Sequence, residues 1–298
     1  MVDLIYSRNS ANKALTIGEI HERAPAVFAE KPVESVTDKY RHISSFDVMQ
    51  TLKFEGWLPV QAAQSAPTKR SNYQDRAHQR HLLAFARESD LERPEGRPEI
   101  VLYNSSDKSS ALKLYDGFYR WICSNSLVAG SGDFTRLKHL KSRMYNFDDI
   151  LQGAITRASG MGDRVDNLKD HSITYDEARH LIGVGLSARW ESYRDMMTRI
   201  DPYDPMTQGT FWTESTVSQI LENCPRKSEQ AFRSDQPVNL WQVFNRTQEF
   251  VMRGGIDLLS VTDRNKSGAF RRARGIADPR KAITINSDLW ETFEGVAA

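Results

Sequence analysis

The chain has 298 residues, of which 39% are hydrophobic and 27% are charged, so it is long enough and apolar enough to bury a core. Its formal net charge of +1 excludes a uniformly basic protein, and any contact with nucleic acid must rest on local clusters. The two cysteines, Cys123 and Cys224, are too few for a disulfide framework or a thiolate metal cage. The N-terminal segment carries early charges and no run approaches the length of a membrane span, so we expect a cytoplasmic protein with no membrane partner.

The pattern of residues predicts an N-terminal arm over residues 1–35 and a single α+β domain over residues 36–298. Within the arm, Thr16 and Glu19 form a capping-box pattern in front of a short helix that ends before Pro25. At the start of the domain, Ser44 or Ser45 begins a second helix that runs through Phe54.

The first part of the domain, residues 36–147, is rich in strand patterns. A Pro- and Gly-containing segment, residues 92–98, predicts a turn. The expected strands cover residues 57–63, 80–87, 100–103, 111–122 and 134–140.

The second part, residues 148–298, is predicted to be helical. Gly160 and Gly162 are expected to interrupt the helix that starts at Asp148. Thr174 begins a helix that is expected to reach Ile200, and Ser287 is expected to cap a short last helix. Further helices are expected over residues 213–223 and 237–253. The order predicts an α+β fold, with a mainly antiparallel bent sheet, helices packed on one face, and a helical C-terminal half.

The hairpin over residues 98–128 holds the densest aromatic run. Alternation along its second strand places Leu112, Leu114 and Phe118 on a core face. The opposite face carries the residues of a single-strand nucleic-acid platform, on which bases stack on rings while cations hold phosphates. The alternative is that this second face is also buried core. The candidates on this second face are Lys113, Tyr115, Tyr119 and Trp121, and Arg120, which alternation places on the core face, is a further candidate for holding phosphate.

Three basic clusters could contact phosphates. The densest lies between residues 264 and 281, which hold seven cations and one acid, Asp278. The alternative for each cluster is a solvated face or a loop. The candidate DNA-binding residues of the three clusters are Lys69, Arg70, Arg76 and Arg80; Arg136, Lys138, Lys141 and Arg143; and Arg271, Arg272 and Arg274.

No catalytic constellation, metal site or cofactor site is predicted. His78 and His81 lack a third ligand, and Gly183 and Gly185 lie inside a helical pattern, where glycines allow close helix packing. The pair Asp148 and Asp149 suits the first turn of a helix better than a nuclease metal site.

Several segments, taken in order, resemble DUF932, a conserved domain of unknown function carried by phages and plasmids. They cover residues 36–48, 102–128, 239–255 and 271–290, with NLWQVFNRTQEFVMRGG and RRARGI among them. A weaker resemblance links the expected order of helices and strands to phage single-strand annealing proteins of the Red-beta and Erf class. That resemblance implies single-stranded DNA in a basic groove, a ring or filament of subunits, and no nucleotide hydrolysis.

The sequence therefore leads to the hypothesis of a non-enzymatic protein of a phage or mobile element that binds and anneals single-stranded DNA in recombination. It would act in the cytoplasm of a bacterial host cell, as a homo-oligomer and without a cofactor. The alternative is an interaction protein that binds and inhibits a host defence protein, since Tyr, Trp and Arg also dominate protein interfaces.

Overall fold

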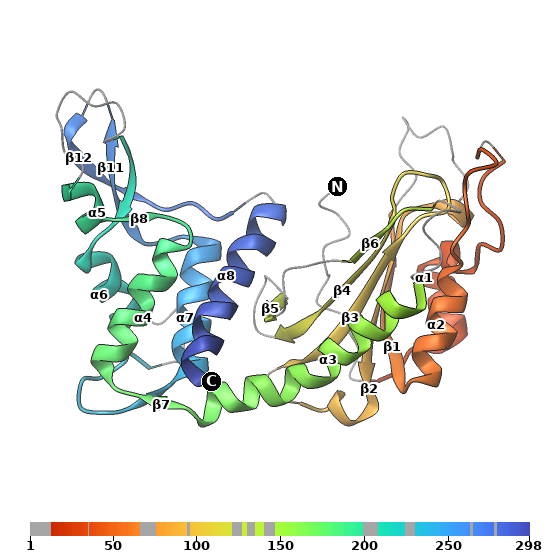
Figure 1. Cartoon of the computed structure of the whole chain (residues 1–298), viewed down its shortest axis with the longest axis horizontal. Helices are drawn as coiled ribbons and strands as arrows, with labels where there is room; N and C mark the ends of the chain where they lie inside the picture. The colour runs from red at the N-terminus through yellow and green to blue at the C-terminus, as the bar shows by residue number, and fades with distance from the viewer. Residues whose placement is uncertain are drawn as a thin grey trace. The chain divides into compact units, whose positions relative to one another are not determined.

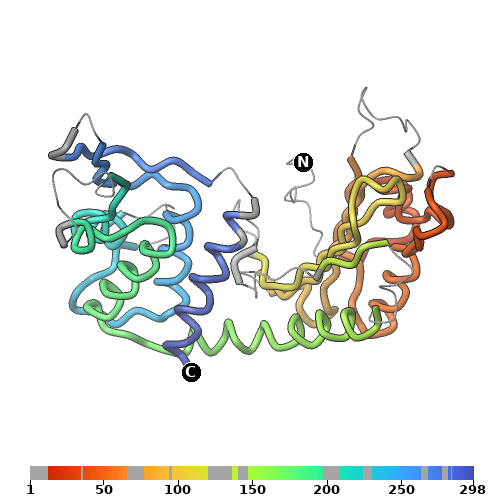
Figure 2. The backbone as a smooth tube through the Cα atoms, turned by 45° about the horizontal axis from the view of Figure 1, so that its top comes forward, coloured from red at the N-terminus to blue at the C-terminus, as the bar shows by residue number. Residues whose placement is uncertain are grey.

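The computed structural model describes residues 13–34, 36–65, 76–93, 96–120, 127–129, 135–139, 147–198, 208–223, 230–262, 265–276 and 279–298. The chain divides into two compact units, Met1–Gly162 and Asp163–Ala298. In Figures 1 and 2 the first unit is coloured from red to green and the second from green to blue. The unit boundary falls inside one long helix, α3 (Phe147–Asp170).

The first unit contains an antiparallel sheet with helices on one face, as the sequence predicts. The described strands pair in the order β1-β2-β3-β4-β5, and β6 also pairs with β4. The remaining helices are α1 (Ile17–Arg23) and α2 (Ser45–Phe54), with short 3-10 turns η1 (Pro25–Phe28), η2 (Arg76–His78) and η3 (Glu88–Asp90). The strands are β1 (Trp57–Gln64), β2 (His81–Arg87), β3 (Gly96–Asn104), β4 (Leu112–Arg120), β5 (Leu127–Ala129) and β6 (Thr135–Leu137).

The main core lies between this sheet and the helices α1, α2 and the start of α3 (Figure 1). Leu112 and Leu114 of β4 are fully buried there, against α2 residues such as Met49 and α3 residues such as Ala154. The predicted alternation of β4 is therefore confirmed. The expected arm also contributes, because Ile20 and Val27 are fully buried in the same cluster.

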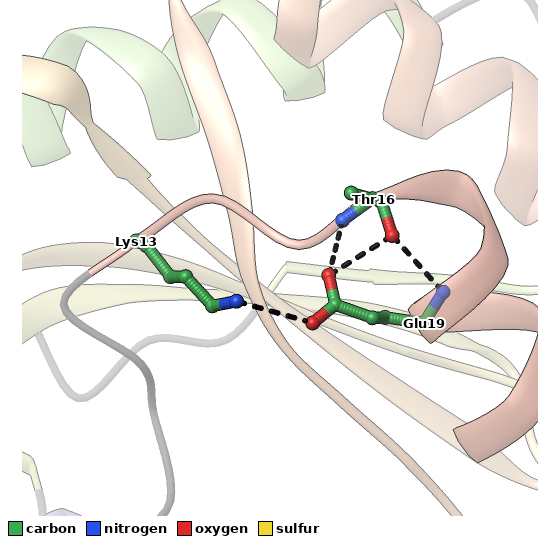
Figure 3. A network of polar contacts seen from close by, with 3 residues as sticks. All are labelled: Lys13, Thr16 and Glu19. Atoms are coloured by element: carbon green, nitrogen blue, oxygen red, sulfur yellow. Dashed lines mark hydrogen bonds and ion pairs between the residues drawn. The ribbon is translucent and has the colours of Figure 1, made fainter.

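Local capping explains why α1 starts where it does. The backbone N–H of Glu19 donates to Thr16 Oγ1 at 3.2 Å, while Glu19 accepts from the Thr16 backbone N–H at 2.8 Å, as the capping-box pattern predicts (Figure 3). Lys13 adds an ion pair at 3.4 Å. The hydrogen bonds from Thr16 lower the pKa of Glu19 to about 2.

Strand β3 and helix α3 of the first unit extend well beyond their predicted ends, while β6 stops at Leu137, short of the expected residue 140. Strand β3 begins at Gly96, so residues 96–98 of the expected turn belong to the sheet. Helix α3 is continuous through Gly160 and Gly162, because its apolar stripe continues past them with the fully buried Met161 and Val165. Tertiary burial outweighs the cost of about 1 kcal/mol that glycine imposes on a helix interior.

The second unit is mainly helical, as predicted, and is built around α7 (Leu240–Arg253), which has buried residues on every side. The other elements are α4 (Tyr175–Ser187), α5 (Tyr193–Thr198), α6 (Glu214–Glu222), α8 (Pro279–Ala297) and a short β10 (Val238–Asn239) that pairs with β7 (Ser172–Ile173). A four-stranded sheet completes it, in the order β12-β11-β9-β8, with β8 (Glu191–Ser192), β9 (Gly209–Trp212), β11 (Asp257–Thr262) and β12 (Asn265–Arg272).

This second sheet is the largest departure from the sequence prediction. The helix expected to reach Ile200 ends at Ser187, and the chain turns into β8 before α5 begins. The start of the basic segment 264–281 forms β12, which pairs with β11 in an antiparallel ribbon (Figure 1). Ser287 does not cap a helix, because α8 already starts at Pro279.

Glycines in helix interiors provide a matched pair of stability predictions. A Cβ at Gly185 would lie 2.6 Å from Thr247 Cγ2 and 3.0 Å from Leu289 Cδ2, whereas at Gly160 it would meet nothing within 4 Å. We expect Gly185→Ala to destabilise the second unit by about 1–3 kcal/mol through overpacking. Gly160→Ala is expected to stabilise α3 by about 0.5–1 kcal/mol. Thermal unfolding of both variants beside the wild type tests the pair, and shifts of equal sign would contradict it.

A buried polar network ties α2 to the end of the first sheet. Asn104 Nδ2 donates to the Ile43 carbonyl at 3.0 Å and to Ser45 Oγ at 2.9 Å. His81 Nδ1 lies 2.9 Å from the Gln79 carbonyl, so Nδ1 carries the proton and Nε2 accepts from Ser45 Oγ at 2.7 Å. His139 Nε2 lies 3.0 Å from Asn104 Oδ1. Ser45 and His81 resemble a nucleophile and its base, but both are buried, with 2% and 0% exposure, so we assign them to the fold.

This network predicts that the first unit loses stability in mild acid. Burial lowers the pKa of both His81 and His139 from 6.5 to about 4. Between pH 6.5 and 4 each of these two histidines therefore binds more protons in the unfolded chain than in the folded one, so their contribution to the free energy of unfolding falls as the pH falls. Each histidine contributes about 3 kcal/mol to this loss.

Hydrogen exchange of β2 and β3 at several pH values, corrected for the intrinsic pH dependence of exchange, measures this loss. The variants His81→Gln and His139→Gln are each expected to reduce the slope by about one proton. A wild-type profile that is flat from about pH 7 to pH 4 would contradict the prediction.

Candidate nucleic-acid interface

The strongest candidate surface lies on the β11–β12 ribbon of the second unit. Registry places Leu258 opposite Arg271 and Ser260 opposite Thr210, so these side chains share one face of the small sheet. This face forms a hollow of about 530 Å³, which we call the ribbon pocket. The ribbon pocket is lined by Trp190, Thr210, Leu258, Ser260, Arg271, Arg272, Ala273 and Arg274.

The charge of the ribbon pocket favours an anion. Three of its lining residues are arginines and, among the described residues that line it, none carries a carboxylate. Arg272 pairs with Asp257 at 3.4 Å, whereas the exposed guanidinium groups of Arg271 and Arg274 form no ion pair with any described residue. Thr210 and Ser260 add hydroxyl donors.

The ribbon also exposes an aromatic side chain on its other face. Phe270 of β12 is 60% exposed, which is unusual for a large apolar side chain. It lies next to Arg271 in the chain and on the opposite face of the ribbon. Trp190 lines the pocket itself and is half-buried.

Arg189 fixes Trp190 and the backbone of Arg274. Its guanidinium lies 4.3 Å from the centroid of the Trp190 ring and donates to the Arg274 carbonyl at 2.6 Å and to the Val251 carbonyl. Burial lowers the pKa of Arg189 from its usual value. Arg189 is thus a positioning residue that joins the end of α4 to the end of the ribbon.

Two glycines allow the end of α7 to run close beside the segment that follows β12. Gly254 has a φ of 73°, and a Cβ there would lie 2.3 Å from the carbonyl oxygen of Ala273. Gly255 donates its N–H to that oxygen at 2.9 Å, and Ile276 donates to the Met252 carbonyl at 2.8 Å. The end of α7 and the segment after β12 therefore run together, which places Arg274 beside the pocket.

A second hollow, of about 660 Å³, runs along α4 in the same unit. Its carboxylates are Asp176, Asp195 and Glu214, and Arg179 pairs with Glu214 at 2.6 Å. These carboxylates offset its cations, so it suits a polyanion less well than the ribbon pocket does. At Gly183 a Cβ would lie 2.8 Å from the ring of Trp212, so this glycine allows close packing against strand β9, whereas Gly185 meets the helices α7 and α8.

In the first unit, the structure brings part of the predicted platform together. Lys113 Nζ lies 5.5 Å from the Tyr103 ring centroid, and Arg136 of β6 pairs in register with Lys113. Burial raises the pKa of Tyr103, while a hydrogen bond from Arg80 and its charge oppose the rise. We call Arg80, Tyr103, Lys113 and Arg136 the sheet corner. Lys138, two residues further on, is exposed.

The aromatic candidates of β4 are largely covered, as the alternative of a second buried face predicts. Tyr119 is 5% exposed and packs with Val101 and Ala84, and Tyr115 is half-buried against the same cluster. The ring of Tyr119 is thus covered, which weighs against a stacking role. Outside the described residues lie Lys69, Arg70, Trp121, Lys141 and Arg143, and also the side chains of Arg76 and Arg120.

Other site classes find little support in the part of the chain that the structure describes. No group of three or more His, Cys, Asp or Glu side chains is placed to hold a metal ion there. Asp148 and Asp149 are exposed in the first turn of α3. Among the described residues, none of the helices has the length and apolar content needed to cross a membrane.

Comparison with known proteins now identifies the family. The family described as "Domain of unknown function (DUF932)" matches residues 32–290. The chain belongs to the DUF932 family. The predicted resemblance is therefore confirmed, and the two segments that meet beside the ribbon pocket are among those that carry it.

Two curated proteins of Escherichia coli (strain K12) are similar to this chain over almost their whole length. The chain is 26% identical to "UPF0380 protein YafZ" over 290 residues, which are 96% of this chain and 92% of that protein. It is 26% identical to "UPF0380 protein YfjQ" over 294 residues, which are 95% and 92% of the two chains. No solved structure matches, so the likeness to phage annealing proteins stays a prediction.

Proposed function

We propose that this DUF932 protein binds single-stranded DNA without enzymatic turnover and promotes annealing in the recombination of a phage or mobile element. The observation that carries the proposal is the ribbon pocket, where two arginines without a described ion-pair partner lie beside a tryptophan and no described lining residue is acidic. Polyanions bind where cations are not neutralised locally.

In the proposed mechanism the protein only holds the DNA strand in position and carries out no chemical step. Arg271, Arg272 and Arg274 hold phosphates of the strand, while exposed Phe270 offers a ring to a base. Contacts to phosphate rather than to base edges leave the base edges free to pair with a complementary strand. Such annealing consumes no nucleotide and needs no cofactor.

The sheet corner supports the same proposal from the first unit. It combines three cations with Tyr103, whose ring Lys113 approaches. The sheet corner is therefore a second basic surface with an aromatic ring, within the first unit. Assembly into a ring or filament would repeat these surfaces along the strand, and we include a homo-oligomer in the proposal.

Filter retention of labelled single strands by the full chain tests the proposal. With three phosphate contacts from the ribbon, affinity should fall about 20-fold between about 50 and 200 mM salt. Duplex of the same length is the control and should bind more weakly. Absence of single-strand binding at about 50 mM salt would overturn the proposal.

The competing function is binding and inhibition of a host protein. Exposed arginine and aromatic side chains are also the residue types of protein-interface hot spots. Capture from host lysate after nuclease treatment separates the two functions. A stoichiometric protein partner retained after nuclease, together with no single-strand binding, would replace the DNA proposal.

A further inference from the structure

We infer that the ribbon pocket holds one nucleotide of the strand, with its base against Trp190 and its phosphate on Arg271 and Arg274. This inference deepens the proposed function and rests on it, because it assigns one nucleotide of the bound strand to a particular place. The pocket volume of about 530 Å³ falls within the range of small-molecule sites.

The lining of the ribbon pocket matches the parts of a nucleotide. A phosphate requires hydrogen-bond donors and positive charge, and Arg271 and Arg274 present planar guanidinium groups that can bind two phosphate oxygens at once. A sugar offers hydroxyl and ether oxygens, which suit the Thr210 and Ser260 hydroxyls. A base offers a flat face, which suits the indole of Trp190.

Trp190 is held in place before any ligand arrives. Its backbone N–H donates to the Leu186 carbonyl at 2.9 Å, which continues the turn at the end of α4. The Arg189 guanidinium lies over its ring and is itself anchored on the carbonyl of Arg274. A ring fixed in this way loses little freedom when a base stacks on it, so stacking contributes more of its energy to binding.

The same contacts couple the stacking ring to the phosphate-binding residues. Arg189 joins Trp190 to the backbone of Arg274, and Ala273 is held by Gly255 and Ile256 through backbone hydrogen bonds of 2.9 and 2.7 Å. The aromatic and basic halves of the pocket are therefore one structural unit. This explains why the pocket should prefer a whole nucleotide over a phosphate or a nucleoside alone.

Photocrosslinking of the full chain tests where the base lies. An oligothymidylate with one 5-iodouracil is bound at low salt, irradiated, digested and sequenced by mass spectrometry. The expected product joins the uracil to Trp190, and excess unlabelled strand removes it. Efficient crosslinking only at other aromatic residues, such as Phe270, would overturn the inference and leave the proposed function standing.

Calorimetry with thymidine monophosphate, thymidine and inorganic phosphate at matched ionic strength tests the chemistry. The monophosphate is expected to bind at least about 10-fold tighter than either part. Trp190→Leu should lose about 10-fold for the monophosphate, while Trp190→Phe keeps most of the affinity and Arg233→Gln, an exposed arginine of the same unit, changes nothing.

Three outcomes separate the inference from the proposed function. Equal affinity for phosphate and monophosphate would overturn the nucleotide pocket. Strand binding that is unchanged in Trp190→Leu would also overturn it, while strand binding itself would stand. Monophosphate binding without any strand binding would overturn the proposed function and leave a pocket for a free nucleotide.

Discussion

Replacing Arg271 and Arg274 together by glutamine is expected to weaken binding of single-stranded DNA about 30-fold at low salt. Both guanidinium groups are exposed and have no ion-pair partner among the described residues, so the change removes charge without breaking a described ion pair. The slope of log affinity against log salt should become less steep by about 1.4, since each contact to a single strand contributes about 0.7. Filter retention or fluorescence polarisation at four salt concentrations measures both quantities.

Two controls make this experiment specific. Arg233→Gln removes an exposed cation of the same unit that pairs with Asp235 at 2.9 Å, and it should leave affinity and slope unchanged. The double lysine variant at positions 271 and 274 keeps the charge but loses the planar fork, so it should retain the slope and lose part of the affinity. If the double glutamine variant binds like the wild type, the ribbon is not the interface.

The parts of this fold that the sequence predicted depend on near neighbours in the chain. Thr16 and Thr174 each cap a helix through a glutamate three positions later, and both caps are present. The alternation along β4 also depends on local pleating, and it correctly assigns Leu112 and Leu114 to the core.

The ribbon was missed because its strands do not alternate cleanly. Leu258 and Leu259 are both buried although they point to opposite faces, because Leu258 lines the ribbon pocket and Leu259 packs with Met196 and Phe211. The strand partner β12 carries NKSGAFRR, which reads as a basic loop. Gly254 and Gly255 end α7 before β11, and Gly268, with a φ of 78°, lies inside β12, where glycine weakens the strand pattern.

The sequence also predicts some residues of the ribbon pocket and not others. The positive charge of Arg271, Arg272 and Arg274 is visible in the sequence, because it depends only on composition. The role of Trp190 is not visible in the sequence, because its position beside the arginines depends on a hydrogen bond from Arg189 to the Arg274 carbonyl. These two residues are 85 positions apart in the chain. Such a contact arises only when α4, α7 and the ribbon have packed together.

A buried ion pair in the first sheet provides the largest expected effect on stability. Arg97 and Glu99 both lie on the face of β3 that the described helices do not cover, and both side chains are 0% exposed. Arg97 Nε donates to Glu99 Oε1 at 2.7 Å, while Glu99 Oε2 has no hydrogen-bond partner among the described residues. Burial raises the pKa of Glu99 well above its usual value and lowers that of Arg97 to about 10.

Removing one partner of this pair leaves the other buried without its counterion. We therefore expect Arg97→Met to lower the free energy of unfolding by about 3–5 kcal/mol. The double variant Arg97→Met/Glu99→Met should recover most of that loss or exceed the wild type, because it also removes the cost of desolvating two charges. Urea unfolding, with hydrogen exchange of β3 and β4 as the local readout, measures both variants.

The control is the exposed pair of Lys13 and Glu19 in the same unit. Lys13 is 71% exposed, so Lys13→Met should change the free energy of unfolding by no more than about 0.5 kcal/mol. If the double variant at positions 97 and 99 is less stable than Arg97→Met, the attraction within the ion pair stabilises the fold by more than the desolvation of its two charges destabilises it. The pair would then be a net stabilising feature of the sheet face that carries Tyr115 and Tyr119, rather than a cost that the fold tolerates.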